Sequence, residues 1–456
     1  MDKDQYHLIG VGIGPANLSL AALLQPCNDI KRIFLDRRNE FIWHPGLLFS
    51  NAELQVAYLK DLVSLVAPTS PYSFLEFLRE NGRLYSFINA NFPHVLRREF
   101  NEYYRWACGK LPDLEFGSEV TSIDVGRGGF EVATSLGVRH AEHLVIGTGL
   151  VPNIPAYAEP FLGDTLFHAS EFLRRKVDAK GRRVAIIGGG QTGAEVFLNL
   201  MTSDATLPAS ISWISRRPNF LPLDDTPFIN EQFTPGYSDY FFGLPQPVRE
   251  SIIEAQKLTS DGISPSTLES IYRRLYELKF LARHECAWEL RPGRSLERIA
   301  RATAGFDLTM RDAATGQMQS LQADLVILCT GYTARLPKCL APIRDRIALN
   351  SRGEYVVRPD YSIEWAGPSH HKIYVQNASR TQRGLADPNL SLLSWRSAKI
   401  VNSVARRTVY DVDNNQSILD WPQAHHAALA HETPAAAPRS FALMRDAEPA
   451  ADAVRG

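Results

Sequence analysis

Two glycine-rich segments, each directly after an apolar run, are the residues of this chain best suited to chemistry. They are Gly10-Val11-Gly12-Ile13-Gly14-Pro15-Ala16-Asn17 and Gly188-Gly189-Gly190-Gln191-Thr192-Gly193. A strand, a glycine turn and a helix N-terminus in this order cradle a pyrophosphate, because free backbone amides and the helix dipole face the anion. One such segment also serves plain strand–helix packing, whereas two in one chain predict a protein that holds two dinucleotides. The sequence therefore indicates a flavoprotein that takes electrons from NAD(P)H.

The residues that end the second predicted strand of each unit indicate which nucleotide binds there. Residues 32–36 end in Asp36, where a carboxylate can accept hydrogen bonds from the ribose hydroxyls of an adenosine. In the second unit, residues 211–214 are followed instead by Ser215, Arg216 and Arg217. Arginine binds a 2′-phosphate bidentately and an acid repels it, so the second unit is predicted to take NADPH rather than NADH. The alternatives are a solvated strand end and a solvated basic turn.

Residues 144–149 and 325–331 are near-identical segments in which an apolar strand runs into a Thr-Gly turn. We expect each to close one dinucleotide-binding unit, which makes the flavin domain discontinuous, with the NADPH domain inserted into it. The predicted fold class is α/β, with two Rossmann-like dinucleotide-binding domains, for FAD and NADPH, and a small helical substrate-side insert. The predicted boundaries are 1–170 and 323–415 for the FAD domain, 171–223 and 286–322 for the NADPH domain, 224–285 for the insert and 422–456 for a disordered tail.

Hydrophobic periodicity supports the last two of these assignments. Leu268, Ile271, Tyr272, Leu275 and Leu278 recur on one helical face, which predicts a helix within an insert that lies over the cofactor cleft. From Pro422 onward the chain is rich in Ala, Pro and His and lacks periodicity, which is typical of disorder.

Composition and charge exclude several classes of partner. The 456 residues carry a formal net charge of -1, so nothing favours nucleic acid or an anionic membrane as partner. The five cysteines are scattered without CxxC spacing, which argues against a disulfide framework or a metal site and suits a reducing cytosol. No uninterrupted apolar run reaches the ~20 residues that a membrane span needs. We expect a cytoplasmic protein without a metal ion.

Further segments carry a resemblance to a known family. They are residues 43–46, 54–55, 58–63, 67–74, 104–107, 167–171, 233–235, 259–263, 384–388 and 390–392, together with a signature running from Asp324 through Thr330-Gly331-Tyr332 to Pro337. On these segments the chain resembles the flavin-dependent N-hydroxylating monooxygenases of siderophore biosynthesis, most closely their L-lysine N6-hydroxylase branch. Cys329 stands where the family has Ala, and Asn17 ends the flavin fingerprint in the family's own variant.

The resemblance implies a reaction in which the cofactors carry the chemistry. NADPH reduces FAD, the reduced flavin forms a C4a-hydroperoxide with O2, and the substrate amine attacks the distal oxygen to become a hydroxylamine. Only a neutral amine can attack, and a desolvated pocket lowers the amine pKa from about 10.4. Trp43, Tyr58 and Tyr72 could supply such surroundings or could equally be plain core.

The resemblance also implies roles for individual residues. Gln55 and Lys60 are the predicted catalytic pair, with Gln55 close to the flavin and Lys60 near the substrate carboxylate and the nicotinamide. Lys60, Ser260, Asp261 and Ser391 are the predicted substrate-binding residues, and Asp261 either holds a second ammonium or belongs to an ordinary turn. The predicted cofactor-binding residues are Gly10, Gly12, Gly14, Pro15, Asn17, Asp36, Trp43, His44, Gln55, His168, Ser170, Gly188, Gly190, Gln191, Thr192, Gly193, Arg216, Arg217, Thr330, Gly331, Tyr332, Leu390 and Ser391.

The amine substrate stays open between L-lysine and short diamines such as cadaverine, putrescine and 1,3-diaminopropane. Ornithine is less favoured, because residues 259–262 resemble the lysine branch more closely. Two other classes remain as alternatives: an NADPH-dependent flavin reductase or oxidase that releases peroxide, and a non-catalytic flavoprotein. The family analogy also implies a homo-oligomer.

Overall fold

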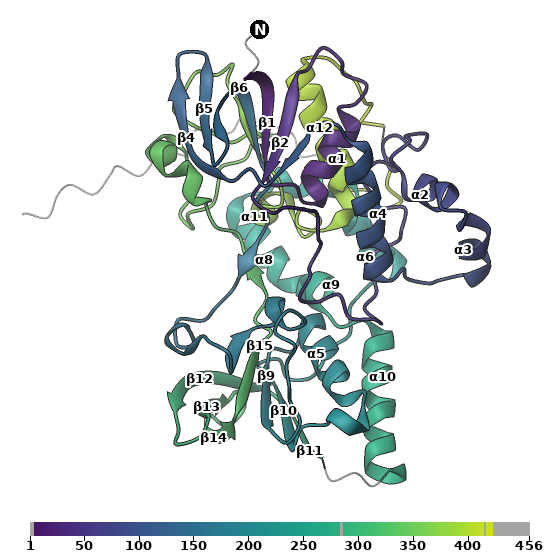
Figure 1. Ribbon diagram of the computed structural model, residues 1–456, viewed down its shortest axis with the longest axis vertical. Helices are drawn as coiled ribbons and strands as arrows, with labels where there is room; N and C mark the ends of the chain where they lie inside the picture. The colour runs from purple at the N-terminus through teal and green to yellow at the C-terminus, as the bar shows by residue number, and fades with distance from the viewer. Residues whose placement is uncertain (1–3, 283–285, 415, 423–456) are drawn as a thin grey trace, which may run out of the picture.

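The computed structural model describes residues 4–282, 286–414 and 416–422, which fold into two α/β units (Figure 1). The first unit is built on a seven-stranded sheet in the order β3-β2-β1-β6-β5-β4, with β17 also paired to β6. Its strands are β1 Gln5–Val11, β2 Arg32–Asp36, β3 Leu114–Phe116, β4 Val120–Gly126, β5 Gly129–Thr134, β6 Gly137–Ile146 and β17 Ile373–Val375. The pairs β3–β2, β2–β1, β1–β6 and β6–β17 are parallel, and β4, β5 and β6 form an antiparallel meander.

Helix α1 (Pro15–Leu23) forms the centre of the first unit. Every residue of α1 after Pro15 is buried, because the helix packs against both α12 (Leu393–Ala405) and α4 (Arg97–Lys110). A helix that is apolar around its whole circumference belongs in a core. The smaller helices α2 (Phe74–Glu80) and α3 (Leu84–Ala90) extend this unit on the side of α4.

The second unit contains a parallel sheet in the order β11-β10-β9-β15-β8. Its strands are β8 Leu166–His168, β9 Arg183–Ile187, β10 Ser210–Ser215, β11 Ala287–Pro292 and β15 Leu325–Leu328. Alternate side chains of these strands face two separate cores, as the two-residue period of a strand requires. Ile186 and Ile327 pack with helix α5 (Gln191–Met201), whereas Ile187 and Leu328 pack with a three-stranded antiparallel sheet. That sheet consists of β12 Arg294–Arg301, β13 Phe306–Asp312 and β14 Met318–Ala323.

Two strands lie in a different unit from the one that the predicted boundaries give them. The boundaries at 170/171 and 322/323 assign β8 and β15 to the FAD domain, but both belong to the second sheet. There β15 lies between β9 and β8, with Ile327 opposite both Ile186 and Phe167. An apolar strand fits either parallel sheet equally well, so periodicity could not assign it. As predicted, each Thr-Gly segment does close one unit, since β6 pairs with β1 and β15 pairs with β9.

The strand that leaves the first unit for the second sheet pairs with the strand that leads back from that sheet. Strand β7 (Val151–Pro152) leads out of the first unit and pairs antiparallel with β16 (Tyr332–Thr333), which leads back. The backbone amide of Asn153 also donates to the carbonyl oxygen of Gly331 over 2.9 Å. The units are therefore joined by a short two-stranded ribbon.

The helical insert does not form one cover over a cleft. Its helices are α6 Pro227–Asn230, α7 Pro235–Phe242, α8 Gln246–Ala255, α9 Lys257–Asp261 and α10 Pro265–Tyr276. Helix α10 packs against α5 in the second unit, while α7 and α8 pack against α11 (Arg380–Arg383) of the returning chain. The predicted face is confirmed for Ile271 and Leu275 of α10 and for Leu278 in the turn that follows, all of which are buried, but wrong for Tyr272, which is 77% exposed. Tyr272 follows Ile271 directly and so lies about 100° around the helix from it.

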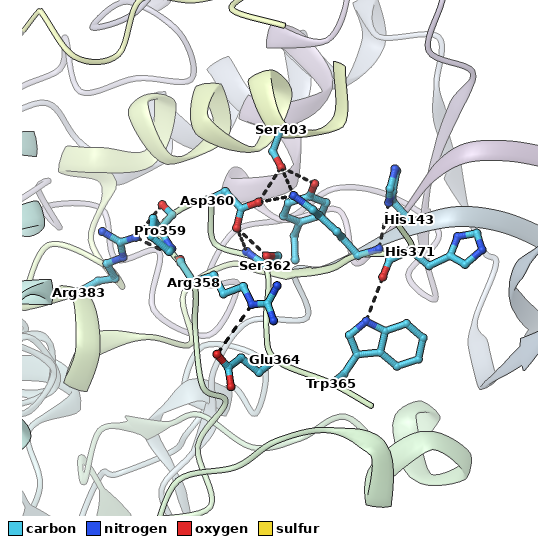
Figure 2. A network of polar contacts seen from close by, with 12 residues as sticks. His143, Arg358, Pro359, Asp360, Ser362, Glu364, Trp365, His371, Arg383 and Ser403 are labelled. Atoms are coloured by element: carbon cyan, nitrogen blue, oxygen red, sulfur yellow. Dashed lines mark hydrogen bonds and ion pairs between the residues drawn. The ribbon is translucent and has the colours of Figure 1, made fainter. Parts of the chain in front are cut away.

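A polar network fastens the returning chain to the first unit (Figure 2). Lys372, next to β17, donates through Nζ to Asp360 Oδ2 over 2.8 Å and to Ser403 Oγ of α12 over 3.0 Å. The hydroxyls of Tyr374 and Ser403 lie 2.8 Å apart. Burial raises the pKa of Asp360, but hydrogen bonds from Lys372, Ser362 and Ser403 outweigh burial and lower it to about 2. The ionised carboxylate thus holds β17 and α12 together.

Short helical turns complete the described structure, at residues 159–161, 169–171, 204–206, 231–233, 277–281, 338–346 and 390–392. Within the described ranges no helix has both the length and the apolar content for a membrane crossing. The predicted disordered tail lies, apart from Pro422, outside the described residues.

The exchange Asp360→Asn is expected to lower the free energy of unfolding by about 2 kcal/mol at neutral pH, since the folded structure lowers the pKa of Asp360 to about 2. A depressed carboxyl pKa stabilises the fold above the unfolded-state value and loses that effect as pH falls toward 2. Urea denaturation of both proteins should therefore give curves that converge as pH is lowered from about 5.

Asp29 provides the matched control. Its pKa is also lowered to about 2, by Arg407, but the two side chains are 59% and 49% exposed. Solvent screens such a pair, so Asp29→Asn should change stability much less than Asp360→Asn. Equal losses in the two variants would contradict the role given to the buried network.

Candidate functional site

The first glycine turn leaves the start of α1 open to an anion. Gly12 has φ +91°, and a Cβ there would lie 2.6 Å from the carbonyl oxygen of Gly147, so only glycine fits. Gly10 has no room either, because its Cβ would strike the ring of Phe34. Gly14 is the N-cap of α1 without a side-chain cap, Pro15 begins the helix, and a Cβ at Gly14 would meet no atom within 4 Å. The first-turn amides and the space beside Gly14 fit a dinucleotide pyrophosphate.

The polar side-chain atoms of Asn17 and Asp36 form hydrogen bonds that stabilise this turn. The amide of Asn17 donates to the carbonyl oxygen of Gly12 over 2.7 Å and accepts from Gln376 over 2.8 Å. Asp36 Oδ2 accepts from the backbone amide of Ile13 over 2.8 Å, and both Asp36 oxygens bind Arg38. Burial raises the pKa of Asp36, yet the hydrogen bonds from Arg38 and Ile13 leave it below its usual value. Asp36 therefore lies at the predicted strand end, while its carboxylate is engaged within the protein.

The second glycine turn repeats the arrangement at the start of α5. Gly188 has φ +133°, and a Cβ there would lie 2.1 Å from the carbonyl oxygen of Cys329. Gly193 is equally confined, against the carbonyl oxygen of Gly188. Gly190 is the N-cap without a side-chain cap, and Gln191 and Thr192 form the half-buried first turn. This helix start also fits a pyrophosphate.

The two arginines after β10 differ in their surroundings. Arg216 is exposed, whereas Arg217 is half-buried. Arg217 donates through Nη1 to the carbonyl oxygen of Asp261 over 2.8 Å and to that of Gly189 over 3.3 Å. Both arginines thus come directly after β10, the strand beside the second glycine turn. A 2′-phosphate of NADPH would require a cation at this place.

His168 and Tyr332 form an aromatic cluster at the passage between the units. Ser170 donates its backbone amide to His168 Nδ1, so Nε2 carries the proton and donates to the carbonyl oxygen of Gly331 over 3.0 Å. Burial lowers the pKa of His168, which favours this neutral form. The ring centroid of Tyr332 lies 5.2 Å from His168 and 6.3 Å from His44. His168 therefore fixes the turn after β15.

Thr330 lies in the same passage, whereas Trp43, Tyr58 and Tyr72 pack against the core of the first unit. Thr330 donates its hydroxyl to the carbonyl oxygen of Asn153 over 2.6 Å, which closes the ribbon. Trp43 packs edge-on against Tyr104, with its centroid 5.4 Å away, and is half-buried. Tyr58 and Tyr72 are also half-buried against the first core.

Gln55 connects the first unit to the start of α5. Its amide Nε2 lies 3.2 Å from Ser264 Oγ, 3.4 Å from the carbonyl oxygen of Gly262 and 3.5 Å from Gln191 Oε1. The loop that carries Gln55 is thereby hydrogen-bonded to the start of α5, at Gln191, and to the 262–264 segment. Sequence reasoning placed Gln55 and Gln191 near cofactors, and the structure brings the two together.

Lys60 and Ser391 meet in a half-buried position. Lys60 Nζ donates to Ser391 Oγ over 2.9 Å and lies 5.6 Å from the ring centroid of Phe233. Burial lowers the pKa of Lys60. Ser391 in turn donates to Asn389 Oδ1, next to the half-buried Leu390. Two predicted substrate residues, 331 positions apart, therefore form one polar pair beside an aromatic ring.

Ser260 and Asp261 face a cation that sequence reasoning missed. Arg380 Nη2 donates to Ser260 Oγ over 3.2 Å and lies 3.7 Å from Asp261 Oδ1. The Asp261 carboxylate thus already has a cationic partner. Arg380 precedes the recognised segment at Gly384 by four residues, and a lone arginine in a polar segment gave no signal of its own. Arg97 and Glu195, which form a buried ion pair between the units, were missed for the same reason.

Comparison with known proteins gives consistent matches over most of the chain. Residues 4–334 match the family described as L-lysine 6-monooxygenase/L-ornithine 5-monooxygenase. The L-lysine N6-monooxygenase of Escherichia coli is 39% identical over 92% of this chain and 99% of its own. The structure of a cadaverine monooxygenase of desferrioxamine biosynthesis from Erwinia amylovora, bound to FAD, superposes with a TM-score of 0.86 at 30% identity, covering 91% of this chain and 98% of that one. The ornithine N-hydroxylase of Kutzneria sp. 744, with reduced FAD, NADP⁺ and L-ornithine, gives 0.80 at 30% identity, covering 88% and 99%.

The two glycine turns give separable predictions. Gly12→Ala should yield folded protein with little bound flavin, because the new Cβ displaces the turn against Gly147. Gly188→Ala should keep the flavin but lose its reduction by NADPH, because the clash is with Cys329 in the second unit. Flavin absorbance per protein and anaerobic reduction by NADPH measure the two effects. The assignment is wrong if each variant loses the property expected of the other.

Proposed function

Because this chain belongs to the L-lysine 6-monooxygenase/L-ornithine 5-monooxygenase family, we propose that it is an FAD- and NADPH-dependent N-hydroxylase acting on the terminal amine of L-lysine. The reaction is an early step in the biosynthesis of a hydroxamate siderophore. Short diamines are the second candidate substrates, because the Erwinia amylovora cadaverine monooxygenase is so similar in structure. The observation that carries the proposal is the half-buried Lys60–Ser391 pair, on a chain with two uncapped glycine-turn helices.

FAD is assigned to the first glycine turn and NADPH to the second. The open N-terminus of α1 supports the first assignment, and Arg216 and Arg217 after β10 support the second. When bound, FAD would carry two electrons from NADPH to O2, so that one oxygen atom of O2 passes to the amine and the other leaves as water. The chain itself then has to bind the amine, orient it and keep water out.

Charge at the predicted substrate residues favours an amino acid over a diamine. Lys60 is a cation, and the one carboxylate among these residues, Asp261, is already paired with Arg380. The half-buried ammonium of Lys60 is suited to bind a carboxylate, which lysine carries and a diamine lacks. Lysine satisfies this arrangement with its carboxylate and keeps its side-chain amine for oxygen transfer.

The proposal is tested by measuring hydroxylamine formed by FAD-loaded protein with NADPH and each of L-lysine, L-ornithine, cadaverine, putrescine and 1,3-diaminopropane. Hydroxylamine from lysine at the highest kcat/KM supports it, and a preference for a diamine establishes the second candidate. NADPH oxidation with peroxide and no hydroxylamine from any amine would instead identify a flavin oxidase. Absence of NADPH turnover in flavin-loaded protein would leave a non-catalytic flavoprotein.

Lys60→Met should raise the KM for lysine at least tenfold, since a hydrogen bond to a charged group contributes about 1.5–3 kcal/mol. The KM for cadaverine should not rise, because a diamine offers no carboxylate. Steady-state kinetics with both substrates measure the difference. The control is Lys110→Met, which removes the last residue of α4, a lysine paired with Glu80. It should leave both KM values unchanged. A parallel rise for lysine and cadaverine would show that Lys60 does not bind the carboxylate.

A further inference from the structure

A buried ion pair crosses between the two units at the start of α5. It joins Arg97, the first residue of α4, to Glu195 of α5, and the two side chains are only 13% and 7% exposed. Two buried charges gain little net stability, because desolvation offsets their attraction. Glu195 Oε2 is moreover buried without a hydrogen-bond partner, which adds to the energetic cost. Stability alone is therefore a poor account of this pair.

Arg97 is fixed to the loop that carries Gln55. Its Nε donates to the carbonyl oxygen of Glu53 over 3.2 Å and its Nη1 to that of Leu47 over 3.4 Å, which leaves Nη2 for Glu195. The backbone amide of Arg97 donates to the carbonyl oxygen of Ala52 over 2.8 Å. Arg97 thus connects the start of α4 in the first unit to the 47–53 segment, where Leu47 and Ala52 pack in the core of the second unit.

Glu195 and the backbone amide of Ser264 together set which way the amide of Gln191 points. Gln191 Nε2 donates to Glu195 Oε1 over 2.9 Å, one helical turn away, and Gln191 Oε1 accepts from the backbone amide of Ser264 over 2.8 Å. An ionised carboxylate only accepts, so it selects the NH2 end of the amide. Gln191 Oε1 is thereby directed at Ser264 and at Gln55 Nε2.

We propose that Arg97 and Glu195 are positioning residues that align the NADPH-binding unit with the flavin-binding unit. The ion pair sets the amide of Gln191 at the start of α5, and Gln191 in turn engages Gln55 in the first unit. The inference rests on the proposed function in one respect, namely that the two glycine turns bind NADPH and FAD. In this role the Arg97–Glu195 pair orients the nicotinamide dinucleotide relative to the flavin. Neither side chain contacts the substrate.

Glu195→Gln tests this with nearly unchanged side-chain volume. It removes the charge and allows the amide of Gln191 to turn. We expect the Kd for NADP⁺, titrated by its effect on the flavin spectrum, and the KM for NADPH to rise about tenfold, which corresponds to roughly 1.4 kcal/mol. The flavin content and the KM for the amine should stay at the wild-type values, and more NADPH should be oxidised per hydroxylamine formed. Arg97→Lys, which keeps the positive charge, should restore part of the NADP⁺ affinity relative to Arg97→Met.

Arg105→Met is the matched control, since Arg105 lies on the same helix α4 and pairs with the exposed Glu40. It should match the wild type in all of these measurements. Unchanged NADP⁺ affinity in both Glu195→Gln and Arg97→Met would overturn the proposal. So would a loss of flavin and of melting temperature that accounts for the weaker NADP⁺ binding, because it would show a purely structural role. If the wild type binds NADP⁺ but hydroxylates no amine, the proposed reaction is refuted. The NADP⁺ titrations of the Arg97 and Glu195 variants still test the role of the ion pair in that case.

Discussion

The close approach of each glycine turn to the turn after a neighbouring strand is the constraint on which the site depends. Gly12 lies against Gly147, and Gly188 lies against Cys329, at distances where no side chain fits. This packing fixes where α1 and α5 begin, and both begin at a glycine without a side-chain cap. The backbone amides of two helices are therefore kept for anions, and the turns they pack against become part of the same sites.

The contacts between the two units show which residues belong to each unit and what joins them. Lys60 and Ser391 both belong to the first unit, so the pair proposed to bind the substrate lies in the same unit as the glycine turn to which we assign FAD. The second unit is attached by the ribbon of β7 and β16, by the contacts of Gln55 and by the pair of Arg97 with Glu195. A two-stranded ribbon is a weak constraint on its own, so these buried polar contacts act together with Leu47, Phe49 and Ala52, which pack in the core of the second unit.

Sequence reasoning succeeded where a local pattern has a local cause. The glycine turns, the strands before them and the buried face of α10 at Ile271 and Leu275 all follow from period and turn chemistry. It failed where an element's place depends on distant partners. Strand β15 is as apolar as a strand of the first sheet but inserts between β9 and β8, and Tyr272 lies outside the face that its neighbours bury.

The sequence by itself determined two dinucleotide-binding units, their order and the basic turn after β10, because these depend on residues close together in the chain. Only the tertiary structure decided that Lys60 meets Ser391, that Asp261 faces Arg380 and that Glu195 reaches Arg97. Each of these pairs joins residues about a hundred or more positions apart, and a single charged residue carries no signal of its partner. Burial and hydrogen-bond geometry select the partner, and both exist only once the chain has folded.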